Sequence, residues 1–196
     1  RLDSLKDFVD ISLPITLPKT GFGEQVEVAI SAFLSGQTIC VDLGPVYRRA
    51  GGSFSFDTHS DHDEQHEEYL IDALEGIDYL WTLAEQTGIA DNLIVVVSSD
   101  FGRTPFYNQS GGKDHWPIGS TMIMERNAPY TNKTIGKTDE VQNAERINPT
   151  TLEIDNFQGI YLNPSHIQLA LRDYLNIYKT SQRYPLVNVD RVNFFG

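Results

Sequence analysis

The sequence has little with which to form covalent crosslinks, because Cys40 is the only cysteine among its 196 residues. One cysteine cannot form an intramolecular disulfide, so the cysteine count does not indicate whether the protein works in an oxidising or a reducing compartment. Cys40 stands in an apolar run, and we expect it to be a small buried side chain. The chain also lacks an apolar run of the length that a bilayer requires, so we expect no membrane span.

Positive charge is also scarce. The sequence has 15 lysines and arginines against 27 acidic residues, which gives a formal net charge of −12. Binding to a phosphate backbone needs a basic face, so we expect no nucleic-acid partner. Hydrophobic residues make up 40% of the chain, as in ordinary folded proteins. The length fits a single α/β domain over 1–196, or the C-terminal portion of a larger one.

Histidine, in contrast, is concentrated in one place. Three of the five histidines lie in the segment 51–66, together with three aspartates. A buried apolar segment could not hold such a run, because each unpaired charge would be costly to desolvate. Two interpretations stay open. The segment is either a solvated acidic loop that caps the next helix, or a metal site in which cation and ligands compensate each other's burial.

The spacing within this segment favours the metal site. Aromatic residues alternate with small polar ones before Asp57, which is a strand-like pattern that would aim Asp57 and His59 to the same side. His62 and His66 are four residues apart and would share a face if a helix has begun there. We therefore take Asp57 and His59 as candidate metal ligands and keep His62 as a further candidate.

Periodicity separates helices from strands along the chain. Apolar positions at helical spacing predict helices over residues 24–34 and 63–87, and a third helix after Asn163-Pro164 with Ser165 as its cap. Continuous apolar or β-branched runs predict strands at 38–43, 93–97 and 120–124, with an edge strand at 187–192.

These elements predict the fold class. The strands at 38–43 and 93–97 are apolar on both faces, which is typical of parallel strands covered by helices. We therefore expect an α/β fold with a mostly parallel sheet sandwiched by helices. Residues 127–159 are polar with little periodicity, and we interpret them as a surface excursion from this domain.

The strand at 93–97 runs directly into Asp100 and Arg103. Functional groups gather at the carboxyl ends of strands in open α/β sheets, so we expect Asp100 to lie near Asp57 and to bind a metal. The alternative role for Asp100 is a helix or turn cap. Arg103 either pairs with Asp100 or binds an anionic substrate, and the sequence leaves both open.

Asp114 and His115 lie in a glycine-rich loop that precedes the strand at 120–124. Neutral imidazole and carboxylate together suit zinc or a mixed-ligand site, so His115 is a further candidate ligand. The plainer alternative is that His115 only forms hydrogen bonds within the loop. Asp114 does not bind the metal itself in this interpretation, but is a candidate for the carboxylate that orients a ligand histidine through a hydrogen bond.

Three motifs, taken in order, resemble the family of unknown function DUF1501, and through it the alkaline phosphatase and sulfatase superfamily. They are Gly-Gly to Asp57-Thr-His59, Asp100-Phe-Gly-Arg-Thr and Gly-Lys-Asp-His115. The resemblance covers residues 21–177 and implies an alkaline-phosphatase-like fold with a two-metal site. By resemblance, Asp57, His59 and His115 would hold one cation, and Asp100 would contribute to the second.

The resemblance also implies a function. A pair of divalent cations, zinc before manganese or calcium, would clamp a small phosphate or sulfate ester for hydrolysis. Members of the family often carry a twin-arginine export signal, which implies a periplasmic or exported protein. The resemblance says nothing about the oligomeric state.

The sequence departs from the superfamily at three places. Phe101 follows Asp100 where a histidine is usual, and Asp57 and His59 are closer in sequence than the usual ligand pair, which keeps His62 as an alternative. The superfamily's first aspartate and its nucleophile have no counterpart near the start, so they either lie upstream of Arg1 or are absent. Three hypotheses follow: a metal-dependent hydrolase, a non-catalytic exported binding protein with the same fold, or a structural domain whose acidic loops are solvated.

Overall fold

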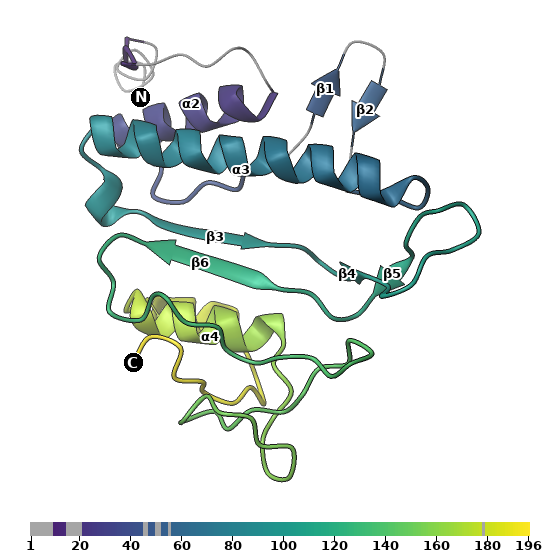
Figure 1. Cartoon of the computed structure of the whole chain (residues 1–196). Coiled ribbons are helices and arrows are strands. Elements are labelled where there is room, and N and C mark those ends of the chain that lie inside the picture. The colour runs from purple at the N-terminus through teal and green to yellow at the C-terminus, as the bar shows by residue number, and fades with distance from the viewer. Residues whose placement is uncertain (1–9, 15–20, 45–46, 50–51, 55, 178) are drawn as a thin grey trace.

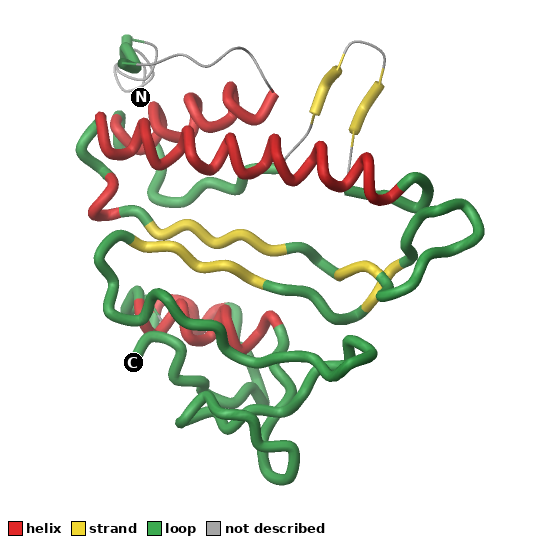
Figure 2. Tube along the Cα trace, viewed as in Figure 1, coloured by secondary structure: helices red, strands yellow, loops and turns green. Residues whose placement is uncertain are grey.

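The computed structural model describes residues 10–14, 21–44, 47–49, 52–54, 56–177 and 179–196. The helices α2 (Gly21–Leu34) and α3 (His62–Gln86) form one layer of the molecule (Figure 1). The strands β3 (Ile94–Ser98) and β6 (Thr121–Glu125) follow below it, and α4 (Pro164–Tyr174) lies beneath β6 (Figure 2). The α/β class predicted from the sequence is confirmed.

The predicted parallel sheet is wrong, because every strand pair in the described residues is antiparallel. β3 pairs with β6, so that Ile94 faces Glu125 and Ser98 faces Thr121. β1 (Tyr47–Arg49) pairs with β2 (Gly52–Phe54), and β4 (Gly102–Arg103) pairs with β5 (His115–Trp116). A parallel connection needs a long crossover, usually a helix. The chain between β3 and β6 instead holds the short β4–β5 pair and turns back.

Two of the predicted strands are not formed. Residues 38–43 are bent, because the Thr38 hydroxyl donates to the Cys40 carbonyl at 2.7 Å and accepts from the Cys40 amide at 3.2 Å. Cys40 is exposed, so its predicted burial is also wrong. Residues 187–192 form no strand, and Val192 is instead buried in a second apolar cluster.

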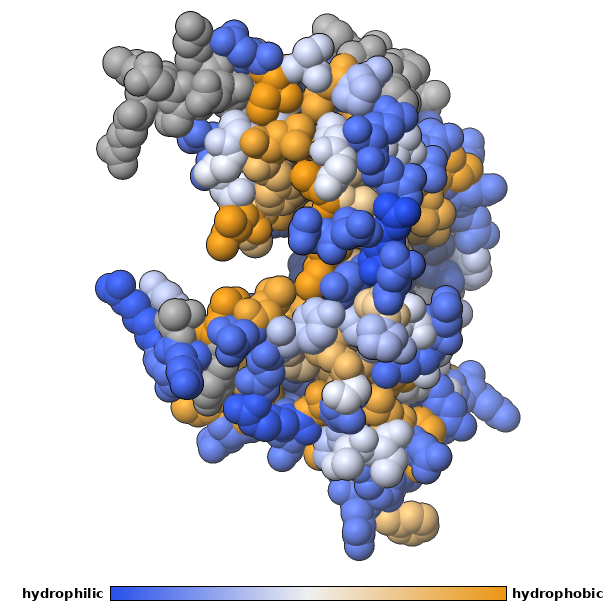
Figure 3. Space-filling model, turned by 90° about the vertical axis from the view of Figure 1, so that its left-hand side faces the viewer, coloured by the Kyte–Doolittle hydropathy of each residue, from blue (hydrophilic) through white to orange (hydrophobic). Residues whose placement is uncertain are grey.

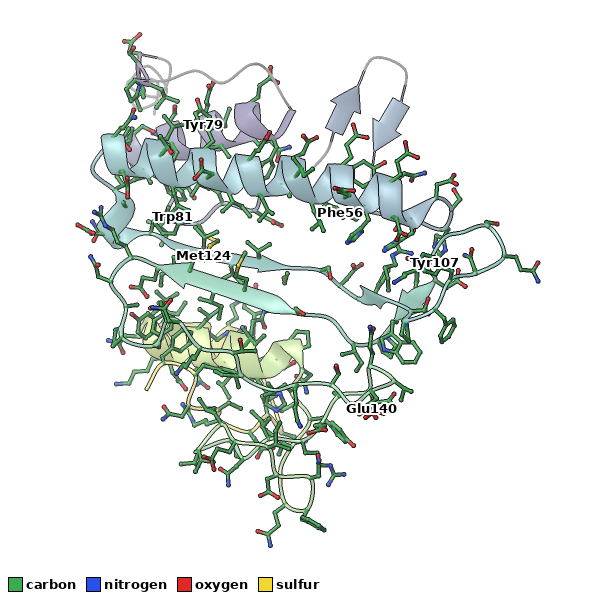
Figure 4. All side chains as sticks on the ribbon, viewed as in Figure 1. Phe56, Tyr79, Trp81, Tyr107, Met124 and Glu140 are labelled. Carbon is green, nitrogen blue, oxygen red and sulfur yellow. The ribbon has the colours of Figure 1, made fainter. Side chains whose placement is uncertain are left out.

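The helices α2 and α3 pack closely and form the main core. A Cβ atom on Gly76 would lie 1.7 Å from a ring carbon of Phe22, so glycine is required for this approach. Val26 and Leu83 are fully buried in the same cluster. The Tyr79 hydroxyl, on the α2 side of α3, donates to Glu27 Oε1 at 2.8 Å (Figure 4).

A second core lies beneath β6, where α4 packs against the segment that follows residue 127. Ile147 is fully buried there and exchanges two backbone hydrogen bonds of 2.9 Å with Ile160. Asn163, rather than the predicted Ser165, caps α4: its side chain accepts from the Ser165 amide, and its own amide donates to His166 Nδ1. Within the described residues, no helix has both the length and the apolar character of a membrane span.

A deep groove separates the α2–α3 layer from the strands, with a volume of about 1190 Å³ (Figure 3). Its walls are mainly apolar and include Leu70 and Leu74 of α3 and residues 93–97. One end of the groove is polar, because Asp57 and Arg103 line it there. The candidate site is built at this end.

Candidate metal centre

Three separate segments form the polar end of the groove. Asp57 and His59 come from the loop between β2 and α3, Arg103 comes from β4, and His115 comes from β5. The β4–β5 register sets Arg103 opposite His115. The first loop is tied to this pair because the Lys113 amide donates to the Thr58 carbonyl at 3.1 Å. The sequence predicted this convergence of distant loops.

Three ligand atoms meet at one point. Asp57 Oδ1 lies 3.0 Å from His59 Nε2 and 3.9 Å from His115 Nε2, and the two Nε2 atoms are 3.2 Å apart. Within the described residues, these are the only histidine, cysteine or acidic side chains that converge closely enough to hold a metal ion. All three are solvent-accessible, with side chains 45–61% exposed, so an ion can reach them from solution.

The size of this triangle fits a zinc-like cation. A circle through the three ligand atoms, drawn from their separations, has a radius of about 2 Å, and Zn–N and Zn–O bonds measure about 2.0–2.2 Å. The donor set of two imidazoles and one carboxylate is also one that catalytic zinc sites use. An ion bound by these three side chains would keep an open coordination position.

Arg103 supplies positive charge at the same point. Its Nη2 donates to Asp57 Oδ1 at 2.9 Å, and its Nη1 lies 3.4 Å from His59 Nε2. The guanidinium also donates to the carbonyls of Phe56 and Lys113, which hold it in place with only 12% of the side chain exposed. The hydrogen bond from Arg103 holds the pKa of Asp57 below its usual value, with smaller contributions from the nearby His59.

Asp114 and Asn108 orient His59. The His59 Nδ1–H donates to Asp114 Oδ1 at 3.1 Å, which leaves the lone pair of Nε2 directed at Asp57 and His115. Asn108 Nδ2 donates to the same Asp114 oxygen and to the His59 carbonyl. The hydrogen bond from Asn108, followed by that from His59, lowers the pKa of Asp114, so the carboxylate is ionised at neutral pH.

The loop that carries His115 passes very close to the loop that carries His59. The Asn108 side-chain oxygen accepts from the amides of Ser110 and Gly112, which closes the turn. A Cβ atom on Gly112 would lie 1.9 Å from the carbonyl carbon of His59, so only glycine fits there. The turn therefore fixes the separation of the two histidine-bearing loops.

His62 and His66 lie on the groove side of the site and stack on each other, with ring centroids 4.6 Å apart. The predicted shared face is confirmed, because α3 begins at His62. Burial, followed by the neighbouring histidine, lowers the pKa of His62, and burial lowers that of His66. His62 Nδ1 is hydrogen-bonded to Thr58 Oγ1 at 2.7 Å, so His62 lies beside the triad and is not part of it.

Asp100 stands apart from the three converging ligands. It lines the same groove as Asp57 and His115 and is exposed at the end of β3. Its ligand atom is not among those that converge in the described residues. Its role as a ligand to a second cation stays a prediction.

Two residues act at the site in ways that the sequence did not predict. Phe101 stacks on the imidazole of His115, with 3.9 Å between ring centroids and 26° between planes. Asn108 joins the two loops, as described above. The glycines after Asn108 indicated a turn, but no local signal connected its amide to His59 forty-nine residues earlier.

The fold and the site together define an α/β protein with a histidine–carboxylate cluster at one end of an apolar groove. The family model described as protein of unknown function (DUF1501) matches residues 37–164, and these include all the residues of the cluster. The chain belongs to this family. Comparison with curated proteins and with solved structures gave no significant match.

Proposed function

We propose that this protein binds one divalent metal ion through Asp57, His59 and His115 and hydrolyses a phosphate or sulfate ester there. The observation that carries the proposal is the convergence of these three ligand atoms within bonding range of one point. Zinc fits the donor set best, and manganese and calcium are the alternatives to be tested. The bound cation would polarise the ester and help to activate water at neutral pH.

The side chains around the three ligands support the proposal that the substrate is an anion. Arg103 places its positive charge beside the three ligands, and this charge attracts a phosphate or sulfate group while its Nη atoms contact Asp57, His59 and two backbone carbonyls. Its two carbonyl contacts position it before any substrate arrives, so little side-chain entropy is lost on binding. Asp114 keeps the His59 Nδ1 protonated and thereby keeps Nε2 free to bind a cation.

The resemblance to alkaline phosphatases and sulfatases and a periplasmic or exported location belong to the same proposal. The three sequence motifs support the resemblance, and the proposed location rests on the resemblance alone. The proposal includes one cation position, because the residue after Asp100 is Phe101, whose apolar ring stacks on His115.

A non-catalytic binding protein is the second candidate, and one observation favours it. Thr58 has a nucleophile-like hydrogen bond to His62, but its side chain is fully buried and cannot reach a substrate. On this alternative, the protein would bind a cation and an oxyanion without turning over an ester. The two candidates share the metal site and differ in catalysis.

Metal analysis of the chelator-treated protein tests the site shared by both candidates. We expect a stoichiometry of one zinc per chain, and we expect His115→Ala and Asp57→Ala to lower the affinity by at least about 100-fold. At a free zinc concentration of 100 times Kd, binding would raise the free energy of unfolding by about 2.7 kcal/mol. The absence of binding for zinc, manganese and calcium would overturn both candidates.

A panel of aryl phosphate and aryl sulfate esters then separates the two. The hydrolase predicts turnover that needs the metal and is lost in Arg103→Ala, while zinc binding in that variant persists. The binding protein predicts competitive binding of inorganic phosphate or sulfate and no turnover. Asp139→Asn serves as a control, because Asp139 is an exposed, hydrogen-bonded aspartate in a different loop.

A further inference from the structure

Within the part of the chain that the structure describes, the edge of β3 that faces the groove has backbone N–H and C=O groups without hydrogen-bond partners. Every second residue of an antiparallel strand points its N–H and C=O away from the paired strand. β6 occupies one side of β3, and within the described residues no hydrogen bond reaches the backbone of Ile94–Ser98 from the other side. The consecutive residues 93–98 all line the groove, as expected when a strand presents its edge to it.

The walls around this edge are apolar and partly uncovered. Leu70 and Leu74 of α3 are 43% and 57% exposed, and Val96 of β3 is 42% exposed. An alkyl chain in the groove would cover these walls but would leave the β3 backbone groups desolvated. An extended polypeptide satisfies both, because its backbone pairs with the edge while its side chains contact the walls.

Residues 38–43 could supply such an extended strand with apolar side chains, and they already lie beside the groove. Their sequence, Thr-Ile-Cys-Val-Asp-Leu, is rich in residues that favour strands. Val41 and Leu43 line the groove, whereas Ile39 is 100% exposed, an unfavourable position for a large apolar side chain. In Figure 1 this connection from α2 runs below α3 in the same direction as β3.

Both ends of this segment are held on α2. Gly36 follows the helix with a positive φ of 67°, and Gly44 exchanges two hydrogen bonds with the Gln25 side chain. Between these ends, the bonds of the Thr38 hydroxyl to Cys40 keep the chain bent around Ile39. Fully extended, six residues span about 20 Å, which is enough to lie along the five residues of β3.

We propose that the free edge of β3 is the docking site for residues 38–43, which add to it as a parallel strand and close the groove. Docking would turn the β3–β6 pair into a three-stranded sheet and bury Ile39. The carboxyl end of the added strand would lie at the same end as Asp100, so closure builds a wall beside the candidate metal centre. The short tether gives this segment a high effective concentration and favours it over a strand from a second molecule.

Cys40 allows a direct test, because it is the only cysteine in the chain. Adjacent strands lie about 4.8 Å apart, within the range of Cα separations that disulfides bridge. Single variants Val95→Cys, Val96→Cys and Val97→Cys would be oxidised under mild conditions, with Phe157→Cys as the control, because Phe157 is 94% exposed on another loop. Disulfides would be identified by mass spectrometry and non-reducing electrophoresis.

We expect at least one β3 variant to form an intramolecular disulfide with Cys40 about 10-fold faster than Phe157→Cys. Rates no higher than that of the control, or disulfides that join two chains, would overturn the proposal.

Hydrogen exchange tests the docking of residues 38–43 without a substitution in β3. We expect slowed exchange at the amides of residues 39–43 and further slowing in Thr38→Val, which lacks the hydroxyl that holds the bend. Exchange of these amides at unstructured-peptide rates in both proteins would contradict docking.

Discussion

The ring of Phe101 lies nearly flat on the imidazole of His115, with 3.9 Å between their centroids. Phe101 therefore fixes the plane of a candidate metal ligand, and it does so from a position at which the superfamily usually has a histidine. The Arg103 guanidinium lies 5.5 Å from the centroid of the same Phe101 ring. One aromatic side chain thus contacts both a candidate ligand and the candidate anion-binding group.

Replacing Phe101 by alanine should loosen His115 without removing any ligand. We expect Phe101→Ala to weaken zinc binding by about 10-fold, because the imidazole must then be ordered during binding. Isothermal titration calorimetry measures this affinity, and Phe157→Ala is the exposed control. An affinity equal to that of the unmodified protein would show that the stacking does not position His115.

The negative charge of Asp114 should contribute to zinc affinity, although Asp114 is not one of the three candidate ligands. In Asp114→Asn the side chain keeps its shape, and its amide oxygen can still accept from His59 and Asn108, but the negative charge that favours the His59 Nδ1–H tautomer is lost. We expect zinc affinity to fall by about 10- to 100-fold. The matched control is Asp139→Asn, and equal affinities for the two variants would remove Asp114 from the proposed role.

Gly112 should tolerate no side chain. A methyl group there would overlap the His59 backbone, so Gly112→Ala must push the two loops apart. We expect a loss of roughly 2–3 kcal/mol in the free energy of unfolding and the loss of tight zinc binding. Gly111→Ala is the matched neighbour, because it has a positive φ of 69° but open space around it, and it should cost only about 1 kcal/mol. Chemical denaturation distinguishes the two, and a Gly112→Ala protein as stable as Gly111→Ala would refute the close approach.

The metal-free protein should lose stability on mild acidification. Burial lowers the pKa values of His62 and His66 below the ordinary 6.5, and the charges of Lys113 and Arg103 act in the same direction, opposed at His62 by Asp63. The unfolded chain therefore binds more protons in this range. The stabilisation is complete above about pH 6.5 and is lost as the pH falls through the folded-state pKa values.

Melting temperatures between pH 7.5 and 5 measure this effect. Each extra proton taken up on unfolding contributes a slope of at most about 1.4 kcal/mol per pH unit. We expect His62→Asn to flatten the profile, because asparagine does not titrate and its Oδ1 can take the place of the Nδ1 that Thr58 Oγ1 contacts. A profile of unchanged slope in this variant would show that His62 is not responsible.

The helices could be predicted from the sequence because their signal is local. Val26 and Ile30 recur at helical spacing and are both fully buried, as the periodicity requires. The direction of strand pairing has no such signal. An apolar run such as Ile94–Ser98 occurs in any strand packed on both sides, and only the path of the chain between β3 and β6 decides that the two are antiparallel.

The candidate site was predictable as a set of residues and less so as a structure. The motifs around Asp57, Asp100 and His115 indicated ligands, and the structure brings the first and third of these together with His59. The contacts of Asn108 and Phe101 depend on the shape of turns and on loops that are far apart in sequence, which spacing alone does not encode. Residues 38–43 have strand-forming chemistry, yet the side chain of Thr38 holds them in a bend.

Trp116 directly follows His115 in β5, and its indole N–H donates to the Gln142 carbonyl at 2.9 Å. Trp81, the only other tryptophan, lies in α3 and contacts the main core. The emission of Trp116 is therefore an intrinsic optical probe of the candidate centre. A Trp81→Phe protein would report the arrival of a cation at His115 as a fluorescence change, with no attached dye.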